Sequence, residues 1–248
     1  MSRSSLRLDT LPGGRLARPA KSAAAAEPGA LAGAGAAKTA KAVQTAKGSA
    51  RKDIAHKAAG EVRIIGGQWR RTRLPVANRP GLRPTPDRVR ETLFNWLGQD
   101  LTGWRCLDAF AGTGALGLEA ASRGAASVLL VEGDAALAAQ LETLRQRLQA
   151  TAVRVQRGDG VAALRQCVPA STHLLLIDPP FDGDLFAPAL QAAARAVAPD
   201  GFIYLEAPVA WTQEQLSPLG LSLHRHLKAG AVHAHLLQRL QAAPDAGT

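Results

Sequence analysis

The chain has 248 residues, a formal net charge of +10 and two cysteines, Cys106 and Cys167. Two thiols exclude a disulfide scaffold and indicate a reducing compartment, so we expect a cytoplasmic protein. Because no stretch approaches about 18 apolar residues and no compact apolar segment stands near the N-terminus, neither a transmembrane span nor a secretory signal is predicted.

Composition separates an N-terminal extension from the rest of the chain. Residues 1–60 contain 18 alanines, 11 lysines and arginines, and only three acids. Such a segment cannot bury enough apolar surface to offset the entropy lost on ordering, so we expect residues 1–60 to form a disordered basic extension. We place a single domain with a full core at 61–242 and a short tail at 243–248.

An arginine-rich arm opens this domain. Residues 61–90 contain eight arginines and two acids, whereas residues 91–248 contain 11 bases and 15 acids. A basic arm on a mildly acidic body indicates a polyanion partner, although a solvated charge run has the same composition. We predict that residues 61–97 bind nucleic acid, with a hairpin near Gly66-Gly67 presenting phosphate-binding arginines and a stacking ring. The predicted contacts are Arg63, Trp69, Arg70, Arg71, Arg73, Arg83 and Arg88.

A helix at the end of the arm carries a polar face. Arg88, Glu91 and Asn95 lie at i, i+3 and i+7, so they share one side of the helix. We interpret this side as the lining of a cofactor or base pocket, with a salt bridge along the helix as the alternative.

Strands and helices alternate from residue 105 onward. Apolar runs predict buried strands, and the segments between them predict helices. Asp134 can cap the helix 135–150, which carries a stripe of leucines at positions 137, 141, 144 and 148. A final hairpin turns at Ala229-Gly230. The alternation predicts an α/β fold with a mostly parallel sheet, helices on both faces and an antiparallel C-terminal hairpin. The predicted strands are 105–110, 127–131, 152–156, 173–177, 202–206, 221–228 and 231–240, and the predicted helices are 113–123, 135–150, 160–168 and 185–197.

A glycine-rich turn follows the first of these strands. Gly112-Thr-Gly114-Ala-Leu-Gly117 matches the G-x-G-x-x-G dinucleotide fingerprint, and Glu132 ends the next strand 20 residues after Gly112. Taken alone, this match predicts an NAD-dependent oxidoreductase. However, Asp108 stands just before the turn, where a carboxylate would repel a pyrophosphate and attract a cation.

Acids at three successive strand ends favour a cationic cofactor instead. A ligand with a sulfonium, an ammonium group and a ribose suits Asp108, while Glu132 would accept from the ribose hydroxyls and Asp159 from an adenine amine. Helix caps or loop carboxylates are the alternative for each acid. The predicted cofactor contacts are Asp108, Phe110, Gly112, Gly114, Glu132 and Asp159.

The tetrapeptide Asp178-Pro179-Pro180-Phe181 follows a buried strand. An acid there lies at the carboxyl edge of the sheet, where open α/β folds bind ligands. The two prolines fix the backbone and leave their carbonyl groups free to accept hydrogen bonds, and an aromatic ring follows. An acid, rigid acceptors and a ring suit a planar base with an amino group, so we predict that these four residues are catalytic. A Pro-Pro turn with a core phenylalanine is the alternative.

Two His-x-His pairs lie near the C-terminus. His224 and His226 precede the predicted turn, His233 and His235 follow it, and each pair faces one side of its strand. The pairs can meet across the hairpin, but no cysteine or acid completes a ligand set. We therefore predict no metal and ordinary edge-strand histidines.

Three blocks resemble the RsmD-type 16S rRNA guanine-N2 methyltransferases. They run from Val62 to Arg70, from Gly81 to Leu97 and from Cys106 to Ala120, and Asp178-Pro179-Pro180-Phe181 joins them. The resemblance covers about residues 61–242 and implies a seven-stranded Rossmann-like methyltransferase fold, S-adenosylmethionine as cofactor and a role in maturation of the small ribosomal subunit. We expect a monomer that acts on 16S rRNA, in an assembly particle.

The residue type at position 178 independently favours guanine. Guanine presents N1–H and N2–H side by side, which suits a carboxylate with two acceptor oxygens, whereas the one donor and one acceptor of adenine suit asparagine. Phe181 would stack on an unpaired or flipped base. An NAD-dependent oxidoreductase and a non-catalytic RNA-binding assembly factor are the alternative functions.

Overall fold

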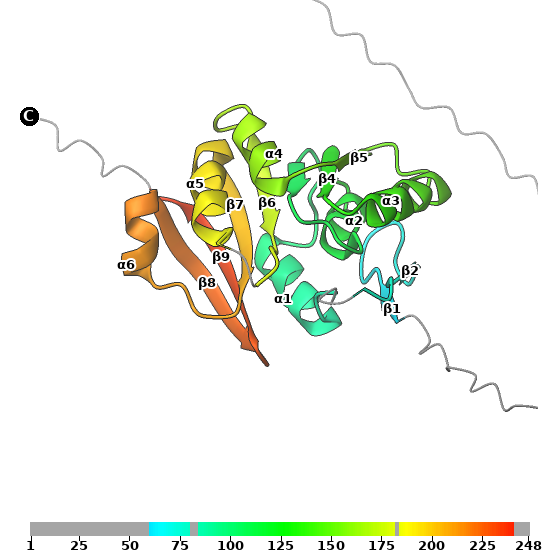
Figure 1. The fold of residues 1–248 in the computed structure, drawn as a ribbon, viewed down its shortest axis with the longest axis horizontal. Helices are drawn as coiled ribbons and strands as arrows, with labels where there is room; N and C mark the ends of the chain where they lie inside the picture. The colour runs from blue at the N-terminus through cyan, green and yellow to red at the C-terminus, as the bar shows by residue number, and fades with distance from the viewer. Residues whose placement is uncertain (1–59, 80–83, 182–183, 241–248) are drawn as a thin grey trace, which may run out of the picture. The chain divides into compact units, whose positions relative to one another are not determined.

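The computed structural model describes residues 60–79, 84–181 and 184–240 (Figure 1). Almost all of the predicted extension, the predicted tail at 243–248 and Arg83 therefore lie outside the described residues. Within the described ranges, no helix has the length and apolar character needed to cross a membrane.

The central feature is one seven-stranded sheet with the strand order β5-β4-β3-β6-β7-β9-β8. The first five strands in that order pair in parallel, whereas β9 runs antiparallel to both β7 and β8. The predicted mostly parallel sheet with an antiparallel C-terminal hairpin is therefore confirmed. The strands are β3 (Arg105–Asp108), β4 (Ser127–Glu132), β5 (Val153–Arg157), β6 (Thr172–Ile177), β7 (Val197–Ala207), β8 (Leu221–Ala229) and β9 (Val232–Arg239).

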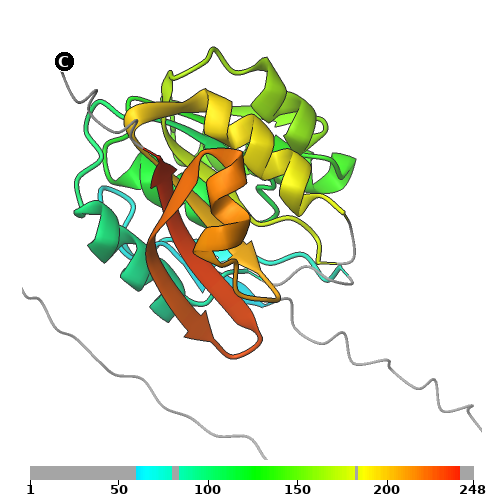
Figure 2. The same cartoon turned by 90° about the vertical axis from the view of Figure 1, so that its left-hand side faces the viewer.

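Helices cover both faces of this sheet because successive strand residues point to opposite sides. On one face, Leu174 and Leu176 of β6 pack with the first three helices, and on the other, Leu175 and Ile177 pack with the last three. Figure 2 shows α1 and the α5–α6 pair on opposite sides of the β8–β9 hairpin. The helices are α1 (Asp87–Leu97), α2 (Ala115–Ser122), α3 (Ala135–Arg147), α4 (Gly160–Gln166), α5 (Phe186–Ala196) and α6 (Gln213–Leu216), followed by the 3₁₀ turn η1 (Ser217–Leu219).

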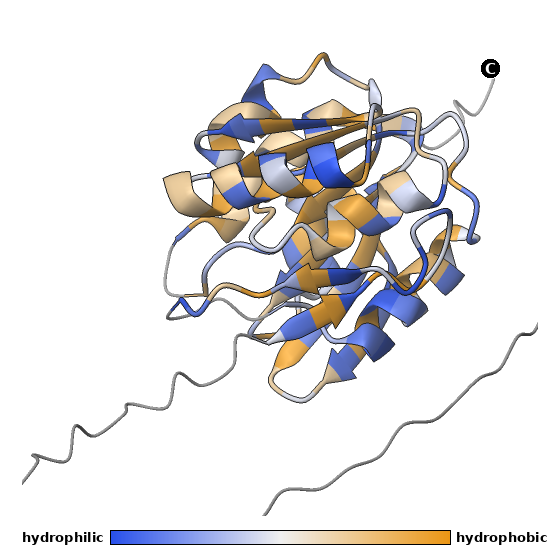
Figure 3. Cartoon of the chain, turned by 90° about the vertical axis from the view of Figure 1, so that its right-hand side faces the viewer, coloured by the Kyte–Doolittle hydropathy of each residue, from blue (hydrophilic) through white to orange (hydrophobic). Residues whose placement is uncertain are grey.

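Amphipathic patterning explains how the helices attach. Leu137, Leu141 and Leu144 of α3 are buried, and the helix turns its polar residues outward. Figure 3 shows the same mixture of hydrophilic and hydrophobic positions along the helices. The Asp134 side chain accepts from the backbone N–H groups of Ala136 and Leu137, so the predicted N-cap of this helix is confirmed.

The arginine-rich arm begins with a separate two-stranded hairpin. Strand β1 (Glu61–Arg63) pairs antiparallel with β2 (Arg73–Pro75), and the connection between them carries Gly66-Gly67, as predicted. Gly67 has a φ of +72°, and a Cβ there would lie 1.8 Å from the carbonyl oxygen of Ser122. The loop thus needs glycine because it lies directly against the end of α2.

Three of the element ends that differ from the sequence predictions have a clear physical reason. Strand β3 stops at Asp108, because the backbone then turns into the glycine loop. Strand β7 already begins at Val197 and includes the Pro199-Asp200-Gly201 turn, where the pairing with β6 shifts register. The final hairpin turns at Gly230-Ala231 instead of Ala229-Gly230, since Gly230 supplies the positive φ of 63°.

Candidate active site at the carboxyl edge of the sheet

Three carboxylates gather where β3, β6 and β7 end. Ile177 of β6 pairs with Leu205 of β7, so the next residues, Asp178 and Glu206, lie side by side on neighbouring parallel strands. Asp108 at the end of β3 pairs with Leu176, two residues before Asp178. Because side chains alternate, the three acids point to the face covered by α1 and α2.

Burial raises the pKa values of all three acids. Burial raises the pKa of Asp178 well above its usual range, and the charges of Glu206 and Asp108 add to the effect. Burial also raises the pKa of Asp108 to about 7, although the Gly117 and Phe110 N–H groups oppose it. A bound cation would favour the ionised forms of these carboxyl groups and would offset part of the cost of their burial.

Glu206 is held by two hydroxyl groups. Its Oε1 accepts from the Thr85 hydroxyl at 2.7 Å and from the Tyr204 hydroxyl at 2.9 Å. Burial raises the pKa of Glu206, while these two hydrogen bonds and the positive charge of Arg90 lower it. The side chain is only 3% exposed, so its direction at the strand end is fixed by these contacts.

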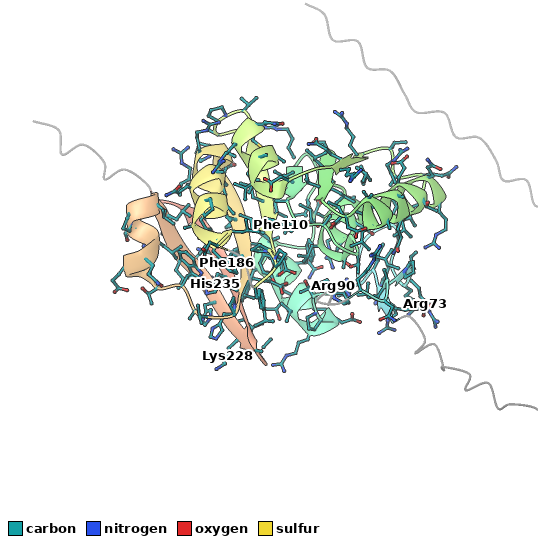
Figure 4. All side chains as sticks on the ribbon, viewed as in Figure 1. Arg73, Arg90, Phe110, Phe186, Lys228 and His235 are labelled. Atoms are coloured by element: carbon teal, nitrogen blue, oxygen red, sulfur yellow. The ribbon has the colours of Figure 1, made fainter. Side chains whose placement is uncertain are left out.

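A buried ion network links α1 to α2 and to the arm. Arg90, labelled in Figure 4, is fully buried, and its Nη1 lies 3.3 Å from the Glu119 carboxylate. Glu119 also binds Arg123 and accepts from the backbone N–H groups of Ile65 and Gly66 at 2.8 and 2.7 Å. The arm hairpin is therefore fastened to the helix that follows the glycine loop.

Arg90 also fastens the segment that carries Thr85. Its Nε donates to the backbone oxygen of Thr85 at 3.1 Å, and its Nη2 bonds Asp87 at 2.7 Å. Thr85 then reaches Glu206, so a continuous chain of contacts runs from the arm to the strand ends.

The glycine turn has the geometry of a cofactor loop. Gly112 and Gly114 have φ values of +50° and +78°, and Gly114 caps α2. The Glu132 carboxylate accepts from the N–H groups of Gly112 and Asp134, both at 2.8 Å, so it is held beside the turn. Asp108 is 2% exposed and accepts from Gly117 N–H at 3.0 Å, which ties the start of α2 to β3.

The residues at this turn fit S-adenosylmethionine better than a dinucleotide. Burial, and to a smaller extent the charges of Glu132 and Glu206, raise the pKa of Asp108. A sulfonium and an ammonium group would favour its ionised form, whereas a pyrophosphate would oppose it. Contact of Glu132 with ribose hydroxyls stays a prediction. The NAD interpretation of the glycine fingerprint is therefore disfavoured by the electrostatics of the loop.

Two other predicted cofactor residues lie on the next loop. Asp159 caps α4 by accepting from Ala162 N–H at 2.6 Å, and its side chain is exposed, so contact with adenine stays a prediction. Phe110 is half-buried, and its ring packs where a Cβ on Gly160 would lie 3.1 Å from it. Gly160 therefore leaves room for the ring between the two loops.

The predicted catalytic tetrapeptide lies beside the acid cluster. Pro179 is buried, Pro180 is exposed, and the Phe181 side chain is 43% exposed. The rings of Phe181 and Phe186 are 6.4 Å apart, and Phe186 lies 6.5 Å from Trp211. Phe181 is thus not a core residue, and its ring begins a row of three aromatic side chains.

The arm presents its arginines outward. Arg63, Arg70, Arg71, Arg73 and Arg88 are all exposed. Two of these have acidic partners in exposed pairs: Arg63 lies 3.4 Å from Asp87, and Arg73 lies 2.9 Å from Glu61.

The structure shows the surroundings of Trp69 and of the polar face of α1, and their roles stay predictions. Trp69 is half-buried and packs against the hydrophobic core, so its ring is less available for stacking than the sequence suggested. Glu91 and Asn95 line a cavity of about 480 Å³ with the Gly66-Gly67 loop, and none of the catalytic tetrapeptide borders it. The polar face of α1 thus lies next to the loop of the arm, because the opposite side of the helix, with Arg90, packs inward.

Sequence reasoning missed Glu206, Thr85, Arg90 and Glu119. Glu206 ends a predicted apolar strand, so the rule that selected Asp178 selects it as well. Thr85, Arg90 and Glu119 give no such signal. Only the folded chain shows which polar residues of a helix, or of the segment before it, point inward.

The histidines meet across the β8–β9 hairpin. His226 and His233 are 3.0 Å apart, and the His226 ring stacks on His235 at 4.8 Å. Burial lowers the pKa of His235 to about 4, and its Nε2 accepts from Trp211 N–H at 3.0 Å. Among the described residues, no group of His, Cys, Asp and Glu forms a metal-binding cluster.

The strand order, the glycine loop and the acidic strand ends define a Rossmann-like methyltransferase. The model of the family described as "Conserved hypothetical protein 95" matches residues 62–238, and the chain belongs to this family. The resemblance to RsmD-type enzymes is thereby confirmed.

Curated relatives share most of the domain. The ribosomal RNA small subunit methyltransferase D of Escherichia coli K12 is 43% identical over 187 residues, which are 74% of this chain and 93% of the relative. The Haemophilus influenzae protein of the same name is 38% identical over 183 residues, covering 68% of this chain and 94% of the relative. Among solved structures, the putative methyltransferase yhhF from Escherichia coli has a TM-score of 0.63 at 44% identity, covering 73% of this chain and 98% of that one.

Proposed function

We propose that this protein transfers a methyl group from S-adenosylmethionine to the exocyclic N2 of a specific guanine in 16S rRNA. The observation that carries the proposal is the placement of Asp178 in an acid cluster beside the glycine loop, with Phe181 exposed next to it. Relatives named ribosomal RNA small subunit methyltransferase D support the choice of RNA.

Asp178 and the Pro179 carbonyl group would hold the amine. The exocyclic nitrogen of guanine is a weak nucleophile because its lone pair is delocalised into the ring. Two acceptors on its N–H groups orient the nitrogen and favour positive charge on it during transfer. The raised pKa of Asp178 also suits a carboxylate that takes up the amine proton after the new N–C bond forms.

Phe181 would stack on the target base. A base can reach the strand ends only when it is unpaired or flipped, and an exposed ring beside the acceptors stabilises it there. The Phe181 ring lies beside that of Phe186, which in turn lies beside Trp211. The prolines keep the acceptors in place because their φ angles are fixed.

Glu132, Asp108 and the Gly112–Gly114 turn would hold the cofactor. Glu132 is already oriented by two backbone N–H groups, so its free lone pairs can accept from ribose hydroxyls. When bound, S-adenosylmethionine supplies an electrophilic methyl group on a positively charged sulfur. The neighbouring carboxylates favour binding of that charge.

The arm would position the RNA. Arg63, Arg70, Arg71, Arg73 and Arg88 are exposed and suited to phosphate contacts, and we keep Arg83 in the set as a prediction. The substrate we propose is 16S rRNA within a small-subunit assembly particle, met by a monomer in the cytoplasm. The basic extension at 1–60 and the tail at 243–248 remain expected additions to the domain.

Mass spectrometry of 16S rRNA from a strain lacking this gene tests the proposal. We expect loss of one N2-methylguanine, restored by the full-length gene and not by an Asp178→Ala version. An unchanged methylation pattern would exclude the proposed reaction. If no methylguanine is lost and the purified protein binds NAD instead of S-adenosylmethionine in calorimetry, the result would favour the oxidoreductase alternative. RNA binding without methyl transfer would indicate an assembly factor.

A further inference from the structure

Glu206 is an unassigned carboxylate at the strand ends. It directly follows Leu205, which pairs with Ile177, so Glu206 and the proposed catalytic Asp178 are neighbours across parallel strands about 4.8 Å apart. Both point to the face that α1 covers. A planar base whose edge contacts Asp178 would therefore bring the neighbouring atom of the same edge toward Glu206.

Only one oxygen of Glu206 is occupied. The Thr85 and Tyr204 hydroxyl groups both donate to Oε1, and no described residue donates to Oε2. Among the described residues, no fully buried side-chain nitrogen or oxygen lacks a partner. Because Oε2 has no partner, it follows that this oxygen is not fully buried, so it keeps surface on which a ligand can donate to it.

We propose that Glu206 is a specificity-determining residue whose Oε2 accepts the N1–H of the target guanine, while Asp178 and the Pro179 carbonyl accept from N2. The inference rests on the proposed function. Guanine carries these two donors on adjacent atoms, and two neighbouring carboxylates match them in number and order. Adenine has no N1–H and would bring its N1 lone pair against Oε2, so Glu206 would reject it.

The surroundings of Glu206 keep it able to accept. Burial raises the pKa of Glu206, and three neighbours oppose that rise: Thr85 before α1, Tyr204 on β7 and Arg90 on α1. On β6, the charge of Glu206 raises the pKa of Asp178. On β9, the residue paired with Glu206 is Ala234, which carries no charge.

A base analogue separates this role from a structural one. 2-Aminopurine keeps the 2-amino group but has no N1–H, so it can accept the methyl group without giving Glu206 a donor. We would place guanine or 2-aminopurine at the modified position of ligated 16S rRNA, reconstitute small-subunit particles and measure methyl transfer by the full-length protein. Wild type is expected to prefer guanine by about tenfold or more, the cost of a buried unpaired acceptor.

The Glu206→Gln variant should change that preference. Its amide can keep the bonds from Thr85 and Tyr204 while turning an N–H toward the base, so guanine turnover falls and the preference shrinks or reverses. Glu214→Gln is the matched control, because it makes the same substitution at an exposed acid outside the site, and its preference should stay that of wild type. Thermal melting reports whether each variant is folded.

The outcomes are distinguishable. If wild type methylates 2-aminopurine as fast as guanine, or if Glu206→Gln keeps the wild-type preference, Glu206 does not read N1–H. The first of these results holds even if the glutamine variant fails to fold. If wild type transfers no methyl group to guanine N2 in any particle, the proposed function itself is wrong.

Discussion

The acidic strand ends and the arginine-rich arm use charge in opposite ways. Asp108 and Glu206 are buried, and burial raises the pKa values of both side chains. Arg63 and Arg73 are exposed, with partners across open surface. In the first region, burial makes each charge costly in free energy, so each needs a specific partner. In the second region, solvent screens each charge, so the arm attracts a polyanion only through the sum of its arginines.

A third set of charges joins the two regions. Glu119 is fully buried between Arg90 and Arg123 and accepts from the arm backbone. Here opposite charges compensate one another in the interior. The comparison teaches that the same residue types position a reaction, hold the fold or attract a polyanion according to their burial and partners.

The largest effect is expected from the acidic strand ends. Asp178→Ala should lower kcat for methyl transfer by about a thousandfold, since it removes the acceptor that orients the amine. The melting temperature should not fall, because the substitution removes repulsion with Glu206 and Asp108. Asp200→Ala, an exposed acid, is the control and should keep wild-type turnover. Near-normal turnover of Asp178→Ala would remove this residue from the mechanism.

Breaking the buried ion network around Glu119 should lower the stability of the folded protein. Glu119→Ala leaves Arg90 and Arg123 buried without their carboxylate, which is expected to lower the free energy of unfolding by about 3–5 kcal/mol. Urea titration measures it. Glu91→Ala on the exposed side of α1 should change stability little. Equal effects of the two substitutions would show that the buried network does not hold the arm.

The pH dependence of stability should report the raised pKa of Asp108. Its pKa is about 7 in the folded chain and about 3.9 unfolded, so the folded state binds more protons between these values. Stability from this group is then fully present below about pH 4 and is lost as pH rises to about 7. Thermal melts of Asp108→Asn should lack that decline, because asparagine does not titrate. Its amide oxygen can still accept from Gly117 N–H, so the local structure is kept. Parallel pH profiles of variant and wild type would contradict the assignment.

The smallest effect per residue is expected in the arm. Replacing Arg63 and Arg70 with alanine should weaken RNA binding about equally for all sequences and reduce the salt slope of binding by about 1 to 2. Stability should hardly change, because an exposed ion pair contributes little. Arg154→Ala with Arg165→Ala removes two exposed arginines outside the arm as a control. An unchanged slope in the first variant would exclude the arm as the phosphate-binding surface.

Much of the fold was predictable because its signals are local. The apolar runs, the Asp134 cap and the leucines of α3 each depend on near neighbours in the chain, and the structure confirms them. The start of β7 at Val197 was not, since pairing with β6 extends the strand through a turn sequence.

Sequence by itself determined which chemistry the chain carries: acids at strand ends, a glycine turn and an arginine-rich arm. Tertiary structure alone decided which charges are buried. Arg88 and Arg90 are two residues apart, yet one faces solvent and the other is fully buried against Glu119. Likewise, Glu206 becomes a neighbour of Asp178 only through strand pairing, because contacts between residues distant in the chain arise when the sheet forms.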